Sequence, residues 1–120
     1  MIRSTMLVLS FIGLATGTAS AGAALVSPPI RASGSNTISC AVVNIGTKPL
    51  ENVTMEIFTS EGLSSGIVNT CTLLQPGLAC SALGAAGLDD YRYCKVTGGS
   101  KKSLRASLCN EATGACVPLQ

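Results

Sequence analysis

Six cysteines are the residues whose chemistry is most restricted by their type and spacing. The chain has 120 residues and contains no histidine, and no two cysteines form a C-x-x-C motif. Zinc sites and thioredoxin-like redox sites depend on these features, so the sequence argues against both. In a small exported chain, an even number of cysteines indicates structural disulfides. The six are Cys40, Cys71, Cys80, Cys94, Cys109 and Cys116.

Other groups that could take part in catalysis lack the partners that catalysis needs. Without histidine, no serine has the usual base that accepts its hydroxyl proton. A Ser–Lys pair at Lys102 and Ser103 follows two glycines, which is more typical of a solvated turn. The only adjacent acids, Asp89 and Asp90, have no neighbours in sequence that would separate their pKa values or complete a calcium site. The sequence therefore predicts no enzyme, no cofactor and no metal site.

The first residues predict a cleaved signal peptide. A positive start at Arg3 precedes an apolar segment, residues 6–14, and small residues follow in an A-x-A pattern that ends at Ala21. This order of regions fits cleavage after Ala21, with cleavage after Ala23 as the alternative. A membrane anchor would need roughly 20 apolar residues, more than this segment has. We therefore expect residues 1–21 to be removed, no membrane span afterwards, and a secreted or periplasmic protein.

Composition favours a single small domain with an aliphatic core. The chain has two tyrosines, two phenylalanines and no tryptophan. Its formal net charge is +2, which is too small to indicate binding to nucleic acid or to a membrane surface. A domain of this length is only marginally stable without cross-links, which gives the expected disulfides a structural purpose.

Residues 36–58 carry the strongest signal for the fold. Two runs of alternating apolar and polar residues flank a loop that contains Gly46 and Pro49. Side chains on a strand alternate between two faces, so each run has one face to bury, and the loop indicates two antiparallel strands. The residues expected to face the core are Ile38, Cys40, Val42, Val53, Met55 and Ile57.

Further short strands are expected after this pair, with a Pro-Gly turn or a Gly-Gly link between them. Residues 22–35 contain two consecutive prolines and are expected to form a flexible leader or an edge strand. Six or seven short strands without helical periodicity predict an all-β antiparallel sandwich over residues 36–120. The later strands are expected at 67–74, 79–83, 91–97 and 103–108.

Three short motifs resemble those of bacterial immunoglobulin-like modules of the cell-adhesion-related type and of small exported relatives without an assigned activity. They are V-x-N-x-G-T-K-P-L-x-N-V-T at 42–54, L-x-P-G at 74–77, and a strand that ends in Tyr-Cys. The resemblance covers residues 37–108 and implies an immunoglobulin-like β-sandwich that serves as a scaffold or binding domain without catalytic residues. The tyrosine corner of antibody domains does not carry over, because Arg92 stands two residues before Cys94.

The resemblance also implies a disulfide framework. Sandwiches of this kind have one bridge between their two sheets, and the two cysteines on the inward faces of long strands fit that bridge. The other cysteines lie on either side of the Pro-Gly turn and at the two ends of the last loop. Among fifteen possible connectivities, we therefore expect one. Its pairs are Cys40–Cys94, Cys71–Cys80 and Cys109–Cys116.

A partner surface is expected on the outer side of segments 91–97 and 103–108. Cys94 and Val96 take the buried face of the first segment, which leaves the tyrosines outside, and the Gly-Gly link would join the two segments as a hairpin. Tyrosine and arginine often anchor interfaces, although lysine on an edge strand also protects against aggregation. The candidate patch consists of Tyr91, Tyr93, Lys95 and Arg105.

The sequence thus predicts an exported structural or binding module that recognises an unknown protein or glycan of the cell exterior. One alternative is a small secreted inhibitor of a hydrolase, which would present the loop 84–90, held in place by neighbouring disulfides, to the enzyme. Another is a subunit of a surface appendage, which would need an incomplete sheet and a donated strand.

Overall fold

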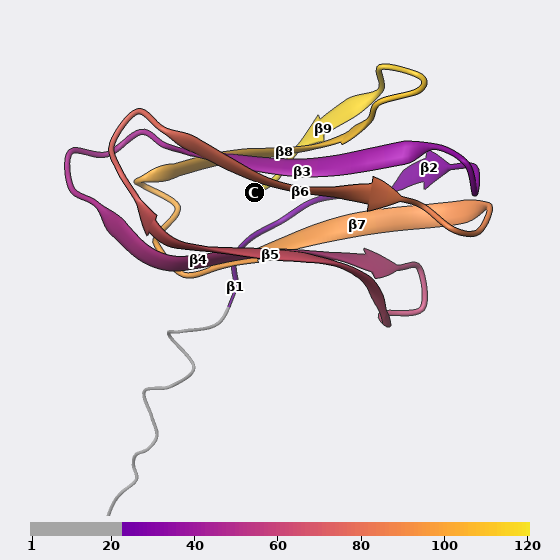
Figure 1. Ribbon diagram of the computed structural model, residues 1–120, viewed down its shortest axis with the longest axis horizontal. Coiled ribbons are helices and arrows are strands. Elements are labelled where there is room, and N and C mark those ends of the chain that lie inside the picture. Colours follow the sequence, from indigo (N-terminus) through magenta and orange to yellow (C-terminus); the bar gives the residue numbers. More distant parts are fainter. Residues whose placement is uncertain (1–22) are drawn as a thin grey trace, which may run out of the picture.

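A computed structural model describes residues 23–120, which form nine β-strands and no helix (Figure 1). The predicted signal peptide, residues 1–21, lies outside the described residues. The strands are β1 (Ala23–Val26), β2 (Ile30–Ala32), β3 (Thr37–Asn44), β4 (Leu50–Thr59), β5 (Ser64–Leu74), β6 (Ala79–Ala85), β7 (Asp90–Thr97), β8 (Leu104–Asn110) and β9 (Cys116–Pro118).

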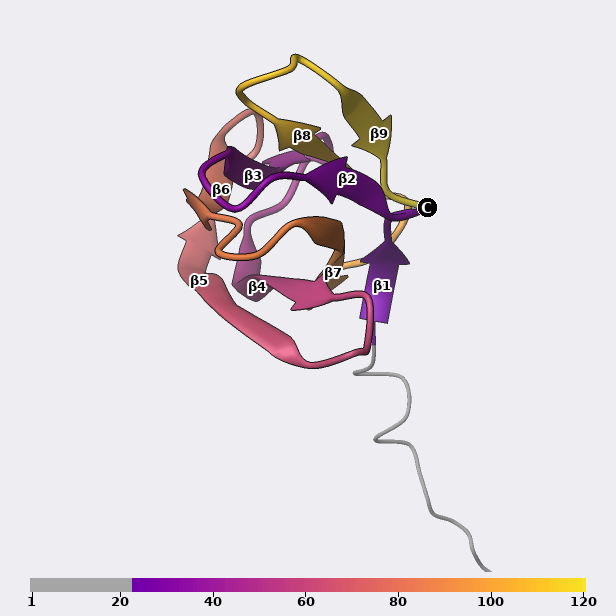
Figure 2. The same ribbon diagram turned by 90° about the vertical axis from the view of Figure 1, so that its right-hand side faces the viewer.

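The strands form two antiparallel sheets that pack face to face (Figures 1 and 2). The five-stranded sheet has the order β1-β7-β4-β5, and β2 pairs with a further part of β7. The four-stranded sheet has the order β6-β3-β8-β9. This arrangement confirms the predicted all-β architecture of two packed antiparallel sheets.

The two central strands alternate as predicted. On β3, every second side chain from Ile38 to Asn44 is buried, and on β4 the same holds from Val53 to Ile57. Each fully buried aliphatic side chain contributes roughly 1.5–3 kcal/mol through the hydrophobic effect. The loop 45–49 carries the chain from one sheet to the other, so β3 and β4 face each other across the core and do not pair.

The core of the described residues is aliphatic, as the composition predicts. Its apolar members are valine, isoleucine, leucine, methionine, alanine and one disulfide, with no aromatic side chain among them. The largest fully buried apolar side chains are Ile38, Met55, Ile57, Leu104, Leu108, Val42, Val53 and Val96.

The segment before the central strands is edge strand rather than flexible leader. β1 and β2 both pair with β7, and Leu25, Ile30 and Ala32 point into the core. The two prolines between the strands cannot donate to a ladder, which explains the break in pairing. At the same edge, Val26 and Gln120 exchange two backbone hydrogen bonds of 3.0 Å, which join the first strand to the end of the chain.

The expected hairpin of segments 91–97 and 103–108 is wrong, because β7 belongs to the five-stranded sheet and β8 to the four-stranded sheet. The Gly98-Gly99 link has positive φ angles of 84° and 69°. A Cβ atom at Gly98 would lie 2.6 Å from the carbonyl oxygen of Asn52, so the link packs directly against the edge of β4. After this link the chain crosses from the five-stranded sheet to the four-stranded sheet. The position beside β7 that was expected for β8 is occupied by β1 and β2.

Candidate functional site

The three aromatic residues of the described chain all lie on the outer face of the five-stranded sheet. Phe58 on β4 stands opposite Tyr93 on β7, and their rings stack with centroids 5.3 Å apart and planes inclined by 16°. Tyr91, two residues earlier on β7, is 44% exposed. The side chains next to them in sequence, Ile57 and Cys94, point into the core, so strand alternation directs the rings outward.

Two cations cover these rings. The Lys95 Nζ atom lies 5.2 Å from the centroid of the Phe58 ring, and the Arg31 Cζ atom lies 5.5 Å from the centroid of the Tyr91 ring. Such contacts stabilise by about 0.5–1 kcal/mol at exposed sites. Arg31 comes from β2, where it pairs with Tyr91. We call these five residues the aromatic face.

Arg105 does not belong to the aromatic face, because β8 lies in the other sheet. It is exposed on the outer side of the four-stranded sheet, opposite Val43 of β3. Its guanidinium donates hydrogen bonds to the carbonyl oxygens of Lys101 (3.3 Å) and Leu104 (3.0 Å). The predicted patch is therefore divided: Tyr91, Tyr93 and Lys95 stay together, and Arg105 joins a different group of cations.

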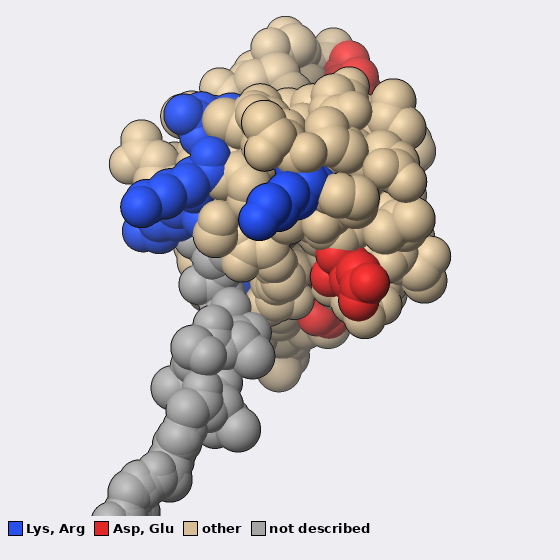
Figure 3. All heavy atoms as spheres, turned by 90° about the vertical axis from the view of Figure 1, so that its left-hand side faces the viewer, with Lys and Arg blue, Asp and Glu red and all other residues tan. Residues whose placement is uncertain are grey.

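That group lies at one end of the sandwich, where the β3–β4 and β7–β8 loops leave the sheets. Figure 3 shows lysine and arginine side chains gathered over this end. The two loops are joined by a backbone hydrogen bond of 2.9 Å from Ile45 to Ser103. We call this region the basic end; its cations are Lys48, Lys101, Lys102 and Arg105, all of them exposed.

A buried arginine lies beneath the opposite end of the sheet. Arg92 is 2% exposed, on the inward side of β7. One Nη atom donates to the carbonyl oxygens of Ala86 (2.9 Å) and Leu88 (3.0 Å), and the other donates to that of Tyr91 (2.9 Å). Its Nε atom has no hydrogen-bond partner among the described residues. The Arg92 side chain therefore holds the β6–β7 loop through hydrogen bonds to backbone carbonyl groups of the loop. Its burial could have been predicted, because Arg92 lies two residues before the inward Cys94 on the same strand.

The loop expected at residues 84–90 is shorter than predicted, because β6 extends to Ala85. Leu88 is 74% exposed near its tip. Asp89 accepts a hydrogen bond from the Gly34 N–H (2.6 Å), and Asp90 accepts one from the Ser60 hydroxyl (2.7 Å). The Ser60 bond, then the Tyr91 N–H and nearby arginines, hold the pKa of Asp90 below its ordinary value. The two carboxylates thus connect the start of β7 to the segments that contain Gly34 and Ser60.

The disulfides match the predicted pairing. Cys40 on β3 is bonded to Cys94 on β7, with Cα atoms 6.3 Å apart, and Cys71 on β5 is bonded to Cys80 on β6, with Cα atoms 6.6 Å apart. Both bridges join the two sheets, one through the core and one along the flank. Three disulfides are consistent with an oxidising extracellular or periplasmic compartment.

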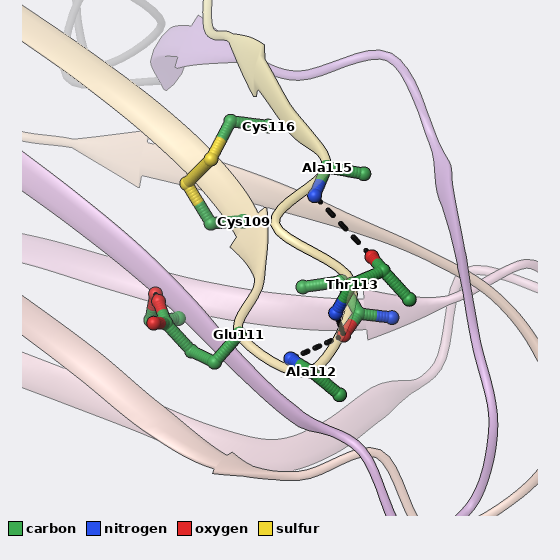
Figure 4. The surroundings of a disulfide bond; sticks show 8 residues. Cys109, Glu111, Ala112, Thr113, Ala115 and Cys116 are labelled. Carbon is green, nitrogen blue, oxygen red and sulfur yellow. Dashed lines mark hydrogen bonds between the residues drawn. A yellow bond between two sulfur atoms is a disulfide. The ribbon is translucent and has the colours of Figure 1, made fainter.

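The third bridge, Cys109–Cys116, links paired residues of β8 and β9 and closes the last loop (Figure 4). Within that loop, the Asn110 Oδ1 atom accepts hydrogen bonds from the N–H groups of Ala112 (2.9 Å) and Thr113 (3.3 Å). The buried Asn110 side chain thus fixes the turn from inside, and the disulfide fixes its two ends.

Residues 23–120 contain no group of three or more histidine, cysteine or acidic side chains that could hold a metal ion. Within the same range, no helix is long and apolar enough to cross a membrane. Comparisons with family models, with curated proteins and with solved structures find no match to this chain.

Proposed function

We propose that the chain is an exported, non-catalytic binding module and that the aromatic face is the surface that contacts its partner. The observation that carries this proposal is the placement of aromatic side chains. Phe58, Tyr91 and Tyr93 all lie outside a core that is otherwise well filled by aliphatic residues. Folding alone does not require one exposed and two partly exposed rings on one face, whereas interfaces are enriched in aromatic residues.

A protein partner fits this face better than a glycan. Aromatic platforms for sugars need a free ring face, but one side of the Phe58 ring stacks on Tyr93 and Lys95 lies over the ring as well. The Tyr91 ring is covered by Arg31. Tyrosine edges with adjacent cations are suited to protein partners with carboxylates, because tyrosine and arginine dominate the energetic centres of protein interfaces.

The relation to immunoglobulin-like modules remains part of the proposal. It is supported by the pairing of β3 with β6 and of β4 with β7, and by the Cys40–Cys94 bridge between sheets. The position of β8 beside β3 departs from that fold, in which the last strand pairs with the strand of the second cysteine.

Affinity capture from the native medium, with the mature chain as bait, tests the proposal. Chemical-shift mapping with the captured protein should then show changes at Phe58, Tyr91 and Tyr93 and few changes on the four-stranded sheet. A partner whose binding shifts only the four-stranded sheet would contradict the assignment of the surface. Turnover of a substrate by the mature chain would contradict the non-catalytic role.

A second candidate function, inhibition of a hydrolase, is favoured by one specific observation. The β6–β7 loop presents the exposed Leu88, and it is held from below by Arg92 through two backbone carbonyl groups rather than by an adjacent cysteine. A loop held in one conformation loses little entropy on binding to an active-site cleft. Inhibition assays with a panel of proteases and glycosidases test this candidate, with Leu88→Asp as the inactive control.

The appendage alternative has less support among the described residues. A donated strand needs an open sheet edge over the core. Here one flank is bridged by Cys71–Cys80, and the other is joined by the Val26–Gln120 hydrogen bonds.

A further inference from the structure

We propose that the basic end binds an acidic polysaccharide, in addition to and independently of the partner at the aromatic face. Of the residues at this end, four are cations, and two shallow hollows open between them. The β7–β8 loop separates the two hollows. Figure 3 shows that the cations concentrate here.

The first hollow, of about 320 Å³, lies between the β3–β4 and β7–β8 loops. Lys48 and Lys102 border it, Leu50 supplies an apolar wall, and Thr47 and Ser103 supply hydroxyl groups. This combination matches a sugar acid, because the lysines can pair with its carboxylate, the hydroxyl groups with its hydroxyls, and leucine with its apolar ring face.

The second hollow, of about 350 Å³, lies on the other side of the same loop. Lys101 and Arg105 border it, and Leu25 and Leu119 form apolar walls. Lys101 and Lys102 are adjacent in sequence and line different hollows. Both hollows combine two cations with apolar side chains, although only the first has hydroxyl groups. Two neighbouring cationic sites fit two acidic units of one polymer, which binds more tightly than a single unit because the second contact is intramolecular.

The loops that form the first hollow are fixed before any ligand binds. The side chain of Asn44 is fully buried, and its Nδ2 atom donates to the carbonyl oxygens of Lys48 and Leu74, each at 2.9 Å. Its Oδ1 atom accepts from the Gly46 N–H at 2.9 Å. On the facing loop, Ser103 N–H donates to the Ser100 carbonyl oxygen at 3.1 Å. This preorganisation lowers the entropic cost of binding.

Titration of the mature chain with oligogalacturonate at low salt, followed by amide chemical shifts, tests the inference. We expect shifts at residues 46–48 and 101–103, none with neutral dextran, and weaker binding as salt rises. Lys48→Gln and Lys102→Gln should each weaken binding about two- to fivefold, as expected for exposed ion pairs, whereas Lys48→Arg with Lys102→Arg should retain it.

Two further measurements distinguish binding of a polysaccharide at the basic end from binding of a protein at the aromatic face. Galacturonic acid monomer should bind much more weakly than the oligomer, and Lys95→Gln, which alters the aromatic face, should leave oligomer binding unchanged. Equal affinity for monomer and oligomer, equal loss with Lys95→Gln, equal binding of neutral dextran, or no binding at low salt would each overturn the inference. None of these results bears on the protein partner of the aromatic face.

Discussion

The outer face of the five-stranded sheet and the outer face of the four-stranded sheet differ in the side chains that they present to solvent. The first carries stacked rings covered by cations. The second carries mostly small side chains around a shallow hollow of about 230 Å³, and no aromatic residue among those described. The residues that line that hollow are Ala41, Val42, Val43, Ala79, Arg105, Ala106 and Ser107.

The inner faces of the same two sheets are alike, since both alternate aliphatic residues into one core. The outer faces therefore differ although both sheets bury the same kind of core face. A surface of small residues is sufficient for a stable sheet, which supports the proposal that the aromatic face contacts another molecule.

Removal of the bridge between the two inner faces should have the largest effect on stability. In the chain-entropy model, the Cys40–Cys94 bridge, with a sequence separation of 54, contributes about 4 kcal/mol. The Cys109–Cys116 bridge lies within the four-stranded sheet, has a separation of 7, and contributes about 2.5 kcal/mol. Urea unfolding of two variants, each with both cysteines of one bridge replaced by alanine, measures the two contributions to the free energy of unfolding. A larger loss from the short bridge would show that the sheets do not depend on their connection.

Arg92 and Arg105 make a matched pair on the two sheets. Arg92→Met should destabilise the fold by roughly 2–3 kcal/mol, because the buried carbonyl group of Ala86 and the partly buried one of Leu88 lose their charged donor. Arg105→Met, at an exposed position, should change stability by less than about 0.5 kcal/mol. Thermal unfolding of both variants provides the measurement. Similar values for the two would mean that Arg92 does not support its loop.

The stacked pair itself should stabilise the five-stranded sheet modestly. A double-mutant cycle with Phe58→Ala and Tyr93→Ala should give a coupling free energy of about 1 kcal/mol. On the other face, Leu83→Ala is the control, because this side chain is 63% exposed. A coupling of zero would mean that the stack of the two rings makes no contribution to the stability of the sheet.

Asp90, at the start of β7, predicts a small dependence of stability on pH. Its folded pKa lies below the ordinary value of 3.8, so its contribution is present above pH 3.8 and is lost as the pH falls through the folded pKa. Melting temperatures of the wild type and of Asp90→Asn between pH 2 and pH 7 should converge at the acid end. A constant difference over the whole range would mean that the carboxylate charge is not involved.

Much of the fold follows from strand alternation, which is local. The inward residues of β3 and β4 were predictable from this rule, and Cys40 and Cys94 share the parity of their buried neighbours. The other two disulfide pairs were predicted from the positions of their cysteines around a turn and a loop, with the resemblance to immunoglobulin-like modules. Phe58 follows the inward Ile57, so the same rule could have placed its ring on the outer face of the sheet, but its position beside Tyr93 depends on the pairing of β4 with β7.

The assignment of strands to sheets was not predictable in the same way. A Gly-Gly link is compatible with a hairpin and with a crossing between sheets, and the choice depends on contacts that are distant in sequence. Here Gly98 packs against Asn52, and β1 and β2 take the position beside β7 that β8 was expected to occupy. The expected hairpin placed Arg105 in the predicted patch, and the observed topology removes it. The expected hairpin also left Lys48, on a distant loop, unrecognised as part of the basic end.

Equilibrium binding of the captured partner to face-specific variants tests the proposed function most directly. Tyr91→Ala, which removes the most exposed ring of the aromatic face, should weaken binding roughly 30-fold, as expected for a residue at the centre of an interface. Leu83→Ala, on the outer face of the four-stranded sheet, should leave the affinity within about twofold. The opposite result, with full affinity after Tyr91→Ala and a large loss after Leu83→Ala, would contradict the assignment of the partner surface to the five-stranded sheet.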